Sequence, residues 1–321
     1  MPAKRIFYID ALKAFAIVLV VMGHTHELWE VEGRESFYLP ILSIFHMPLF
    51  MALSGYVTNV EKFQLGKRAK MLIPFFVFGF AWTAYNQLPF LGFFEHEAKY
   101  GYWFLYVLFM FFVFLALIRA TKRNLYVGMG IVQICLMGLH FMLHRTIPGT
   151  TLSTDHMFQL WPFFCLGILL RRGMLDKIFD RKAVSAVICL FGIIIIWGGK
   201  LYFHLTSTLA GYCNDLMSFF IVPLLFLIFH EAENRMKNRK GWLKSTMKYF
   251  GHQLGVNTLQ IYVLQYFAIR WFLMFIVDYL QVSIEEYELI LNPIVGVLLS
   301  VICVWISQLL HKVKLGFVFG R

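Results

Sequence analysis

The chain has 321 residues, of which 60% are hydrophobic and only 15% are charged. A soluble domain carries about 25% charged residues, so the composition excludes an ordinary soluble protein and indicates a polytopic membrane protein. The formal net charge of +11 does not indicate a nucleic-acid partner. The basic residues lie in short connections between apolar runs, where membrane topology and contact with lipid account for them.

Apolar runs long enough to cross a bilayer recur along the whole chain. We expect an all-α fold of about ten transmembrane helices, near residues 7–27, 39–58, 71–91, 101–119, 124–143, 157–171, 183–203, 214–230, 252–277 and 289–311. The first run superficially resembles a signal peptide. It contains Asp10 and Lys13 and lacks a small-residue cleavage site, which favours the first helix of the mature protein.

The distribution of charge predicts the orientation of these helices. Most of the 29 Lys and Arg residues fall in alternate connections, and the intervening connections hold only Arg34, Lys99, Arg145 and Lys200. Positive residues favour the cytoplasmic side, so both termini are expected to be cytoplasmic. The longest connections are then an outer loop at 28–38 and an inner loop at 231–248. We expect residues 1–321 to form one membrane domain without an appended soluble domain.

The first predicted span contains three ionisable residues, Asp10, Lys13 and His24. Each costs roughly 2.5–3.5 kcal/mol at the centre of a bilayer, so such residues usually mark a functional site. Lys13 and His24 are eleven residues apart, which on a helix is three turns plus about 20° and about 16 Å. One helix face therefore presents a group toward each side of the membrane. The alternative is structural: an Asp–Lys pair between helices and an interfacial histidine.

Other polar or aromatic residues in the runs have a functional and a structural interpretation. His46 lies at nearly the same depth as His24, so it either shares its pocket or hydrogen-bonds between helices. Ser54, next to Gly55, either lines a pocket or allows close helix packing. Trp103 begins a span, where it either stacks on a sugar or anchors the interface. Tyr262 either lines a cavity or bonds to a neighbouring helix.

A basic segment, Lys67-Arg68-Ala69-Lys70, precedes the third run. Cationic side chains of this kind bind phosphate groups well, although topology alone also explains their place. The five cysteines form no C-x-x-C pair, and no nucleotide-binding loop or Cys/His metal spacing occurs. We therefore expect neither a metal nor a disulfide framework.

Two segments together resemble the acyltransferase 3 family of membrane O-acyltransferases, most closely its fucose 4-O-acetylase-like branch. They are the first run, with Asp10, Lys13 and His24 in the family's spacing, and Phe45–Tyr56, which matches its Phe/His-x-Pro run ending in Ser-Gly-aromatic. Later segments around residues 67–74, 102–105, 163–167 and 255–262 are also similar. Two positions depart from the family: Lys13 replaces a frequent Arg, and Gln265 a frequent His.

The resemblance implies transfer of an acetyl or similar acyl group from cytoplasmic acyl-CoA, expected to be acetyl-CoA, to a sugar hydroxyl. The acceptor would belong to a cell-surface polysaccharide or a lipid-linked precursor, and the enzyme to a bacterial cytoplasmic membrane. An alcohol attacking a thioester needs a base and a group that stabilises the oxyanion. We assign these catalytic tasks to His24 and Lys13, with Asp10 orienting Lys13. The expected acceptor-binding residues are His46, Ser54, Trp103 and Tyr262, and the expected donor-binding residues are Arg68, Lys67 and Lys70.

Two other functions fit the same residues less well. A transporter or flippase for a polysaccharide precursor or a small solute would also have about ten helices, intramembrane charges and a histidine proton relay. Transporters often contain paired repeats, and no convincing repeat occurs in this sequence. A sensor or assembly scaffold would use the buried charges structurally and would not bind acyl-CoA.

Overall fold

The computed structural model of the chain describes residues 6–28, 39–96, 98–122, 124–146, 152–205, 207–237, 242–275 and 288–320. Within these ranges the regular secondary structure is helical and includes no strand. Seven of the described helices are long and apolar enough to cross a membrane: α1 (Phe7–Leu28), α2 (Leu39–Tyr56), α6 (Trp103–Ala120), α7 (Leu125–Thr146), α10 (Lys182–Tyr202), α11 (Ser207–Lys237) and α14 (Glu288–Lys312). The predicted all-α class and the polytopic membrane architecture are confirmed.

Three of the ten predicted spans correspond to shorter helices. They are α4 (Leu72–Tyr85, 14 residues), α8 (Thr154–Leu169, 16 residues) and α13 (Thr258–Leu273, 16 residues). At 1.5 Å per residue these helices are about 21–24 Å long, less than the roughly 30 Å hydrocarbon core. The total of ten spans and the cytoplasmic location of both termini therefore stay predictions.

Two expectations for the segment after residue 230 were wrong. Most of the predicted inner loop 231–248 is helical, because α11 continues to Lys237 and α12 (Trp242–Val256) begins soon after. Glu231 with Arg235, and Glu233 with Lys237, have the i, i+4 spacing that stabilises an exposed helix. The predicted span 252–277 is divided at Asn257 between α12 and α13. The predicted outer loop 28–38 lies outside the described residues except for Leu28.

The chain divides into two compact units. The first unit consists of Met1–Leu53 and Leu169–Ser307, and the second of Ser54–Ile168 and Gln308–Arg321. The predicted catalytic residues Asp10, Lys13 and His24 belong to the first unit.

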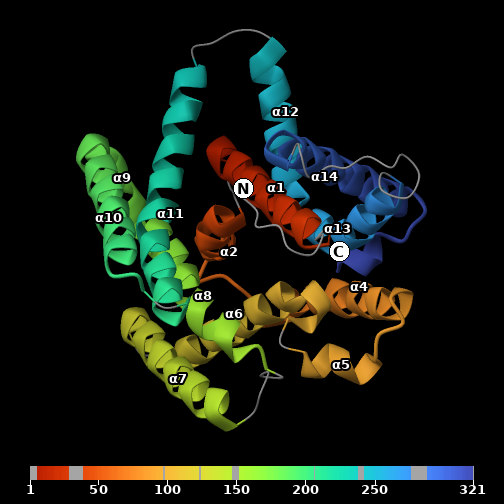
Figure 1. Cartoon of the computed structure of the whole chain (residues 1–321), viewed down its shortest axis with the longest axis horizontal. Helices are drawn as coiled ribbons and strands as arrows, with labels where there is room; N and C mark the ends of the chain where they lie inside the picture. Colours follow the sequence, from red (N-terminus) through yellow and green to blue (C-terminus); the bar gives the residue numbers. More distant parts are fainter. Residues whose placement is uncertain are drawn as a thin grey trace. The chain divides into compact units, whose positions relative to one another are not determined.

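Helix α1 packs against α11, α12 and α13 of the first unit (Figure 1). Gly251 and Gly255 lie one turn apart on α12 and let the two backbones approach closely. A Cβ atom at Gly255 would overlap the carbonyl group of Asp10, whereas one at Gly251 would lie 3.5 Å from Ala11. On α14, Asn292 Nδ2 donates to the Met22 carbonyl at 3.2 Å. Helix α1 therefore packs against several helices of the first unit at once.

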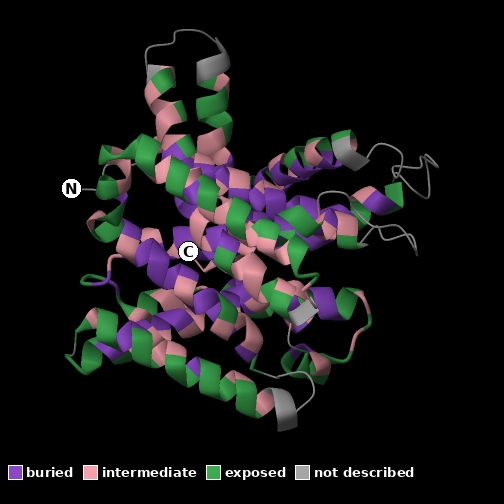
Figure 2. Ribbon diagram, turned by 60° about the vertical axis from the view of Figure 1, so that its left-hand side comes forward, coloured by how far each residue is buried: buried purple, intermediate pink, exposed green. Residues whose placement is uncertain are grey.

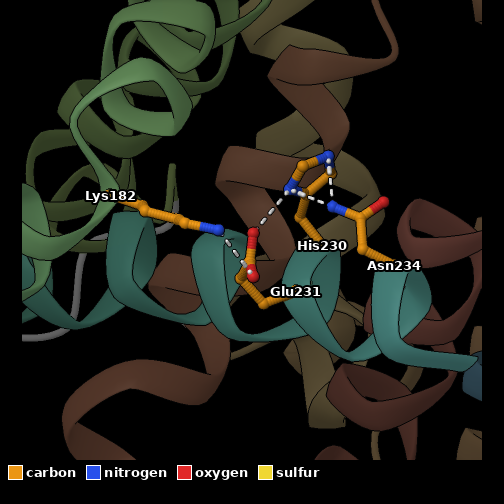
Figure 3. Close-up of polar contacts among 4 residues, drawn as sticks. All are labelled: Lys182, His230, Glu231 and Asn234. Carbon is orange, nitrogen blue, oxygen red and sulfur yellow. Dashed lines mark hydrogen bonds and ion pairs between the residues drawn. The ribbon is translucent and has the colours of Figure 1, made fainter.

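A polar cluster joins α10 to α11 in the same unit (Figure 3). The carboxylate of Glu231 accepts from Lys182 Nζ at 3.1 Å and lies 3.8 Å from His230 Nδ1. The His230 ring also stacks on Phe179 of α9 (Leu175–Asp180), with centroids 3.8 Å apart. One turn further along α11, Glu233 accepts from the backbone N–H of Tyr8 at 3.0 Å. This bond satisfies one of the open donors at the start of α1.

The second unit has an aromatic core formed by α6 and α8. Phe111 lies 5.3 Å from Trp161 and 5.5 Å from Phe164, measured between ring centroids. Trp161 Nε1 donates to the Met129 carbonyl of α7 at 3.1 Å, which satisfies its buried polar atom. At the end of α2, a Cβ atom on Gly55 would overlap the Phe164 carbonyl. The expected role of the Ser54-Gly55 pair in close helix packing is therefore confirmed for the glycine.

Exposed residues, coloured green on the ribbon of Figure 2, occur along many of the helices. Many of them are large and apolar. On α10, for example, Val187 is 65% and Ile194 is 66% exposed, and on α14 Trp305 is 67% exposed. A soluble protein rarely exposes large contiguous apolar surfaces, whereas a membrane protein places them against lipid.

Candidate active site

The proposed catalytic residues share one uninterrupted helix. Helix α1 runs from Phe7 to Leu28, so the helical spacing assumed for Lys13 and His24 holds, and the two residues lie on one face. Asp10 is 8% exposed, while Lys13 and His24 are partly buried. The ionisable residues of the first run therefore lie in a packed environment rather than on an open surface.

His24 contacts a tyrosine that the sequence did not point to. Its Nε2 atom lies 3.0 Å from the hydroxyl of Tyr266 on α13, and the two ring centroids are 4.7 Å apart. The side chain of the preceding residue, Gln265, also lies beside the imidazole. Gln265 is fully buried, and its Nε2 atom donates to the Tyr262 carbonyl at 3.0 Å. Helix α13 thus contributes two neighbouring side chains that lie against the ring of His24, the proposed base.

Two polar atoms at this place have no hydrogen-bond partner. Nδ1 of His24 and Oε1 of Gln265 are both buried and unpaired within the described part of the chain. A buried polar atom without a partner is uncommon in a native structure, and strain, a catalytic role or a bound water or ion can account for it.

His46 lies in the same unit as His24. Leu42 and Phe45 of α2 pack against Leu19 and Met22 of α1, and His46 lies within electrostatic range of His24. Its Nδ1 atom lies 2.7 Å from the Leu42 carbonyl. A carbonyl only accepts, so Nδ1 carries the proton and, in the neutral ring, Nε2 is the acceptor. The neighbouring placement of the two histidines agrees with their predicted common depth.

The carboxylate of Asp10 faces α12. Its Oδ2 atom lies 3.4 Å from Nδ1 of His252, one turn before the glycine that touches the Asp10 backbone. The sequence offered only Lys13 as a partner for Asp10. His252 lies at the inner end of a predicted span, where nothing in the local pattern marks it as a ligand of the first helix.

Tyr262 is 4% exposed and lies one turn before Tyr266 on α13. Of the predicted site residues, Asp10, Lys13, His24, His46 and Tyr262 belong to the first unit. The other predicted site residues, namely Ser54, Trp103, Arg68, Lys67 and Lys70, belong to the second unit.

In the second unit, Arg68 differs from its basic neighbours. Arg68 is partly buried on α3 (Leu65–Ala69), with its guanidinium carbon 4.7 Å from the centroid of the Phe112 ring. Burial lowers the pKa of Arg68, yet a guanidinium keeps its charge at neutral pH. Lys67 and Lys70 are exposed. The segment thus offers one cation held against an aromatic ring beside two exposed ones.

Trp103 stacks on a second histidine. Its ring centroid lies 4.0 Å from that of His156 on α8, with the planes inclined by 30°. Nearby on the same helix, Asp155 Oδ1 lies 2.6 Å from Nδ1 of His140 on α7. The Trp103 ring therefore lies against an imidazole, and its role in stacking on a sugar or in anchoring the interface stays a prediction.

The sequence missed Tyr266, His252 and Asn292 as residues around α1. Asn292 was detectable as a single amide in an apolar run, and Tyr266 as a residue one turn after Tyr262. Their contacts with α1 depend on helix pairing, which periodicity does not reveal.

Comparison with known proteins agrees with this architecture. The model of the acyltransferase 3 domain matches residues 6–312. The chain is 25% identical to the nodulation protein NolL of Mesorhizobium japonicum over 96% of this chain and 87% of the relative, and 28% identical to NolL of Sinorhizobium fredii over 50% and 47%. No solved structure matches. Because the domain match covers nearly the whole chain and the helices are those of an integral membrane protein, the chain belongs to the acyltransferase 3 family of membrane acyltransferases.

Proposed function

We propose that this membrane acyltransferase moves an acetyl group from cytoplasmic acetyl-CoA to a hydroxyl of a sugar. The acceptor belongs to a cell-surface polysaccharide or a lipid-linked precursor, and the enzyme works in a bacterial cytoplasmic membrane. The observation that carries the proposal is the contact of His24 with Tyr266, which holds an imidazole inside a membrane helix that also carries Lys13. A neutral imidazole held in one orientation can accept the proton of a hydroxyl and so act as a general base.

The reaction needs a proton acceptor and a group that stabilises negative charge. His24 removes the proton of the sugar hydroxyl while its oxygen attacks the thioester carbonyl. Lys13, nearer the cytoplasmic end of α1, contacts the pantetheine arm or a phosphate of the donor, or stabilises the oxyanion. Asp10 orients the Lys13 ammonium and also contacts His252.

The basic segment of α3 is proposed to hold the phosphates of CoA. Arg68 is preorganised by its contact with Phe112, and Lys67 and Lys70 add unspecific attraction. A guanidinium can bind a phosphate with two parallel hydrogen bonds, which a lysine cannot do.

In the first unit the acceptor is proposed to contact His46 and Tyr262, and Ser54 and Trp103 of the second unit stay predicted acceptor-binding residues. Trp103 and Tyr262 provide aromatic faces, which suit the apolar face of a sugar ring, and His46 and Ser54 provide polar atoms. The similar NolL proteins carry the name nodulation protein, which states no acceptor.

The test uses purified protein in lipid vesicles with labelled acetyl-CoA and glycans from the host cell envelope. Transfer of the label to a glycan is expected, with loss of one acetyl mass from surface glycans when the protein is removed from cells. A general base contributes typically 10²–10⁴-fold, so His24→Ala should lower the rate by at least about 100-fold. A His24→Ala protein that inserts normally and transfers acetyl at the full rate would refute the assignment. Labelled acetyl-CoA that stays intact would favour a transporter.

A further inference from the structure

The carboxylate of Asp10 lies in the first turn of α1, where the start of a helix favours a negative side chain. This side chain is only 12% exposed, so a charge on it needs partners that replace water. One of its oxygens, Oδ2, lies 3.4 Å from Nδ1 of His252 on α12. The imidazole of His252 is therefore one of the groups that replace water around this carboxylate.

The packing of α12 fixes the place of this imidazole. Gly255 follows His252 by three residues, and a Cβ atom there would overlap the carbonyl group of Asp10. On the other side of His252 in the sequence, a Cβ atom at Gly251 would lie 3.5 Å from Ala11. Because the two backbones are in such close contact, α12 has little freedom to slide along α1. The imidazole is thus held beside the carboxylate by main-chain packing.

The direction of the hydrogen bond follows from the chemistry of its two atoms. A carboxylate oxygen only accepts, so Nδ1 of His252 carries the proton and donates it to Oδ2 of Asp10, in the neutral ring as in the charged one. The neutral ring then has its lone pair on Nε2. The side chain of His252 is 44% exposed, which allows water to reach this second nitrogen. The contact with Asp10 therefore depends on one N–H group at one position of the ring.

We infer that His252 is a positioning residue for Asp10: its Nδ1–H group holds Oδ2, so that Oδ1 is directed to the ammonium of Lys13. The inference rests on the proposed function, in which Lys13 acts on the acyl donor. Lys13 follows Asp10 by three residues, a spacing at which side chains of a helix are neighbours. A carboxylate that rotates freely meets the ammonium with either oxygen, whereas one held at Oδ2 offers a single orientation. His252 thus contributes to the reaction without touching a substrate.

Lys248 provides a contrast on the same helix. It lies one turn before His252 and is exposed, and its Nζ atom lies 5.8 Å from the centroid of the Phe7 ring. It therefore brings a positive charge to the same end of α1 but places it over an aromatic ring. A general effect of positive charge on α12 would be lost in Lys248→Leu, whereas the specific hydrogen bond is lost only when His252 or Asp10 is changed.

The hydrogen bond is tested first, by a measurement that does not depend on turnover. The protein is labelled with ¹⁵N-histidine in lipid vesicles, and the resonances of His252 are identified by their loss in His252→Asn. Under alkaline conditions, where the ring is neutral, we expect the proton on Nδ1, although free histidine favours Nε2. In Asp10→Ala the proton should move to Nε2. A proton on Nε2 in the unchanged protein, or no response to Asp10→Ala, would overturn the inference.

Acetyl transfer then tests the positioning role. His252→Leu should lower kcat/KM for acetyl-CoA by at least about tenfold, the effect of losing one hydrogen bond to a charged group. His252→Asn should stay within about threefold of the unchanged protein, because its amide N–H group takes the place of Nδ1–H. Ring packing or helix propensity would give the opposite order, since leucine is more apolar and favours a helix more than asparagine does. Lys248→Leu should change the value by less than about twofold.

A double-mutant cycle shows whether His252 acts through Asp10. In Asp10→Ala, the further change His252→Leu should lower kcat/KM by less than about twofold, because residues that act as one unit are not additive. Full additivity, or a larger loss in His252→Asn than in His252→Leu, would overturn the inference while acetyl transfer itself continues. Failure of the proposed function appears separately, as full transferase activity in His24→Ala or as labelled acetyl-CoA that stays intact.

Discussion

At the scale of single residues, the two ring nitrogens of His24 have different environments. Nε2 faces the Tyr266 hydroxyl, and Nδ1 has no partner among the described residues. Orientation of a catalytic imidazole through its second nitrogen is a common requirement, because the bond determines both the tautomer and the direction of the ring. Tyr266 supplies that bond from a helix far along the chain.

Tyr266→Phe should lower kcat by about 2–10-fold, the effect expected for loss of one neutral hydrogen bond. The KM for acetyl-CoA should change less than about twofold, because the ring still packs against His24 and the donor does not touch it. Steady-state rates of labelled acetyl transfer provide the measurement. Tyr249→Phe, an exposed tyrosine on α12, is the matched control. A rise in the donor KM with unchanged kcat would contradict the positioning role.

Arg68→Gln should raise the KM for acetyl-CoA by at least about tenfold, since hydrogen bonds to charged groups contribute about 1.5–3 kcal/mol. Arg68→Lys should restore only part of this loss, because a lysine cannot bind phosphate with two parallel bonds. Donor titrations of acetyl transfer measure both values. Lys62→Gln, at an exposed lysine five residues before the basic segment, is expected to change nothing. An equal effect of Lys62→Gln and Arg68→Gln would reduce the role of Arg68 to general positive charge.

At the scale of helices, α1 depends on glycines of its neighbours. Gly255 of α12 leaves room for the Asp10 carbonyl, and this approach also brings His252 to the Asp10 carboxylate. Overpacking of a close contact costs about 1–3 kcal/mol, because the backbones must separate.

Gly255→Ala should therefore destabilise the protein by about 1–3 kcal/mol and also lower activity through displacement of Asp10. Gly198→Ala is the control, since a Cβ atom there meets no other atom within 4 Å. Alanine is preferred over glycine in a helix by about 0.5–1 kcal/mol, so Gly198→Ala should be neutral or stabilising. Thermal unfolding in vesicles compares the two. Equal Tm values for both variants would show that the α1–α12 contact can relax.

Sequence periodicity and charge located most of the long helices, because an apolar run of about 20 residues has few other stable structures in a membrane. The same signal failed at α11 and α12, whose charged ends are helical although they lack apolar character. It also missed the break at Asn257, which contains neither Pro nor an unusual charge. The three catalytic candidates on α1 were visible, whereas Tyr266 and His252 were not, since only tertiary packing brings them to that helix.

At the scale of the whole molecule, the number of spans decides the sides of the membrane on which the termini lie. With ten spans both termini are cytoplasmic, whereas with the seven longest helices alone they lie on opposite sides. The number is ten if the three shorter helices α4, α8 and α13 also cross the membrane, and seven if they do not. The alternating basic connections favour ten.

Reporter fusions at the two ends test this topology. We expect a fluorescent protein that matures only in the cytoplasm to be bright at either terminus, and alkaline phosphatase, active only outside, to be silent at both. Phosphatase fused after His204, in the predicted outer connection between the spans 183–203 and 214–230, provides the positive control. Opposite results at the two termini would exclude the ten-span arrangement.

Asn257, the single residue between α12 and α13, connects the helix that contacts the first turn of α1 to the helix that contacts its last turns. Before Asn257, Gly255 and His252 lie against Asp10; after it, Tyr266 reaches His24. Asn257 has φ −104° and ψ 23°, away from regular helical values. A change in these two torsion angles would move Tyr266 away from the His24 imidazole, while the contacts of α12 with Asp10 stay in place. Binding of the acyl donor near Asp10 and Lys13 would in this way reach His24 through the backbone torsion angles of Asn257.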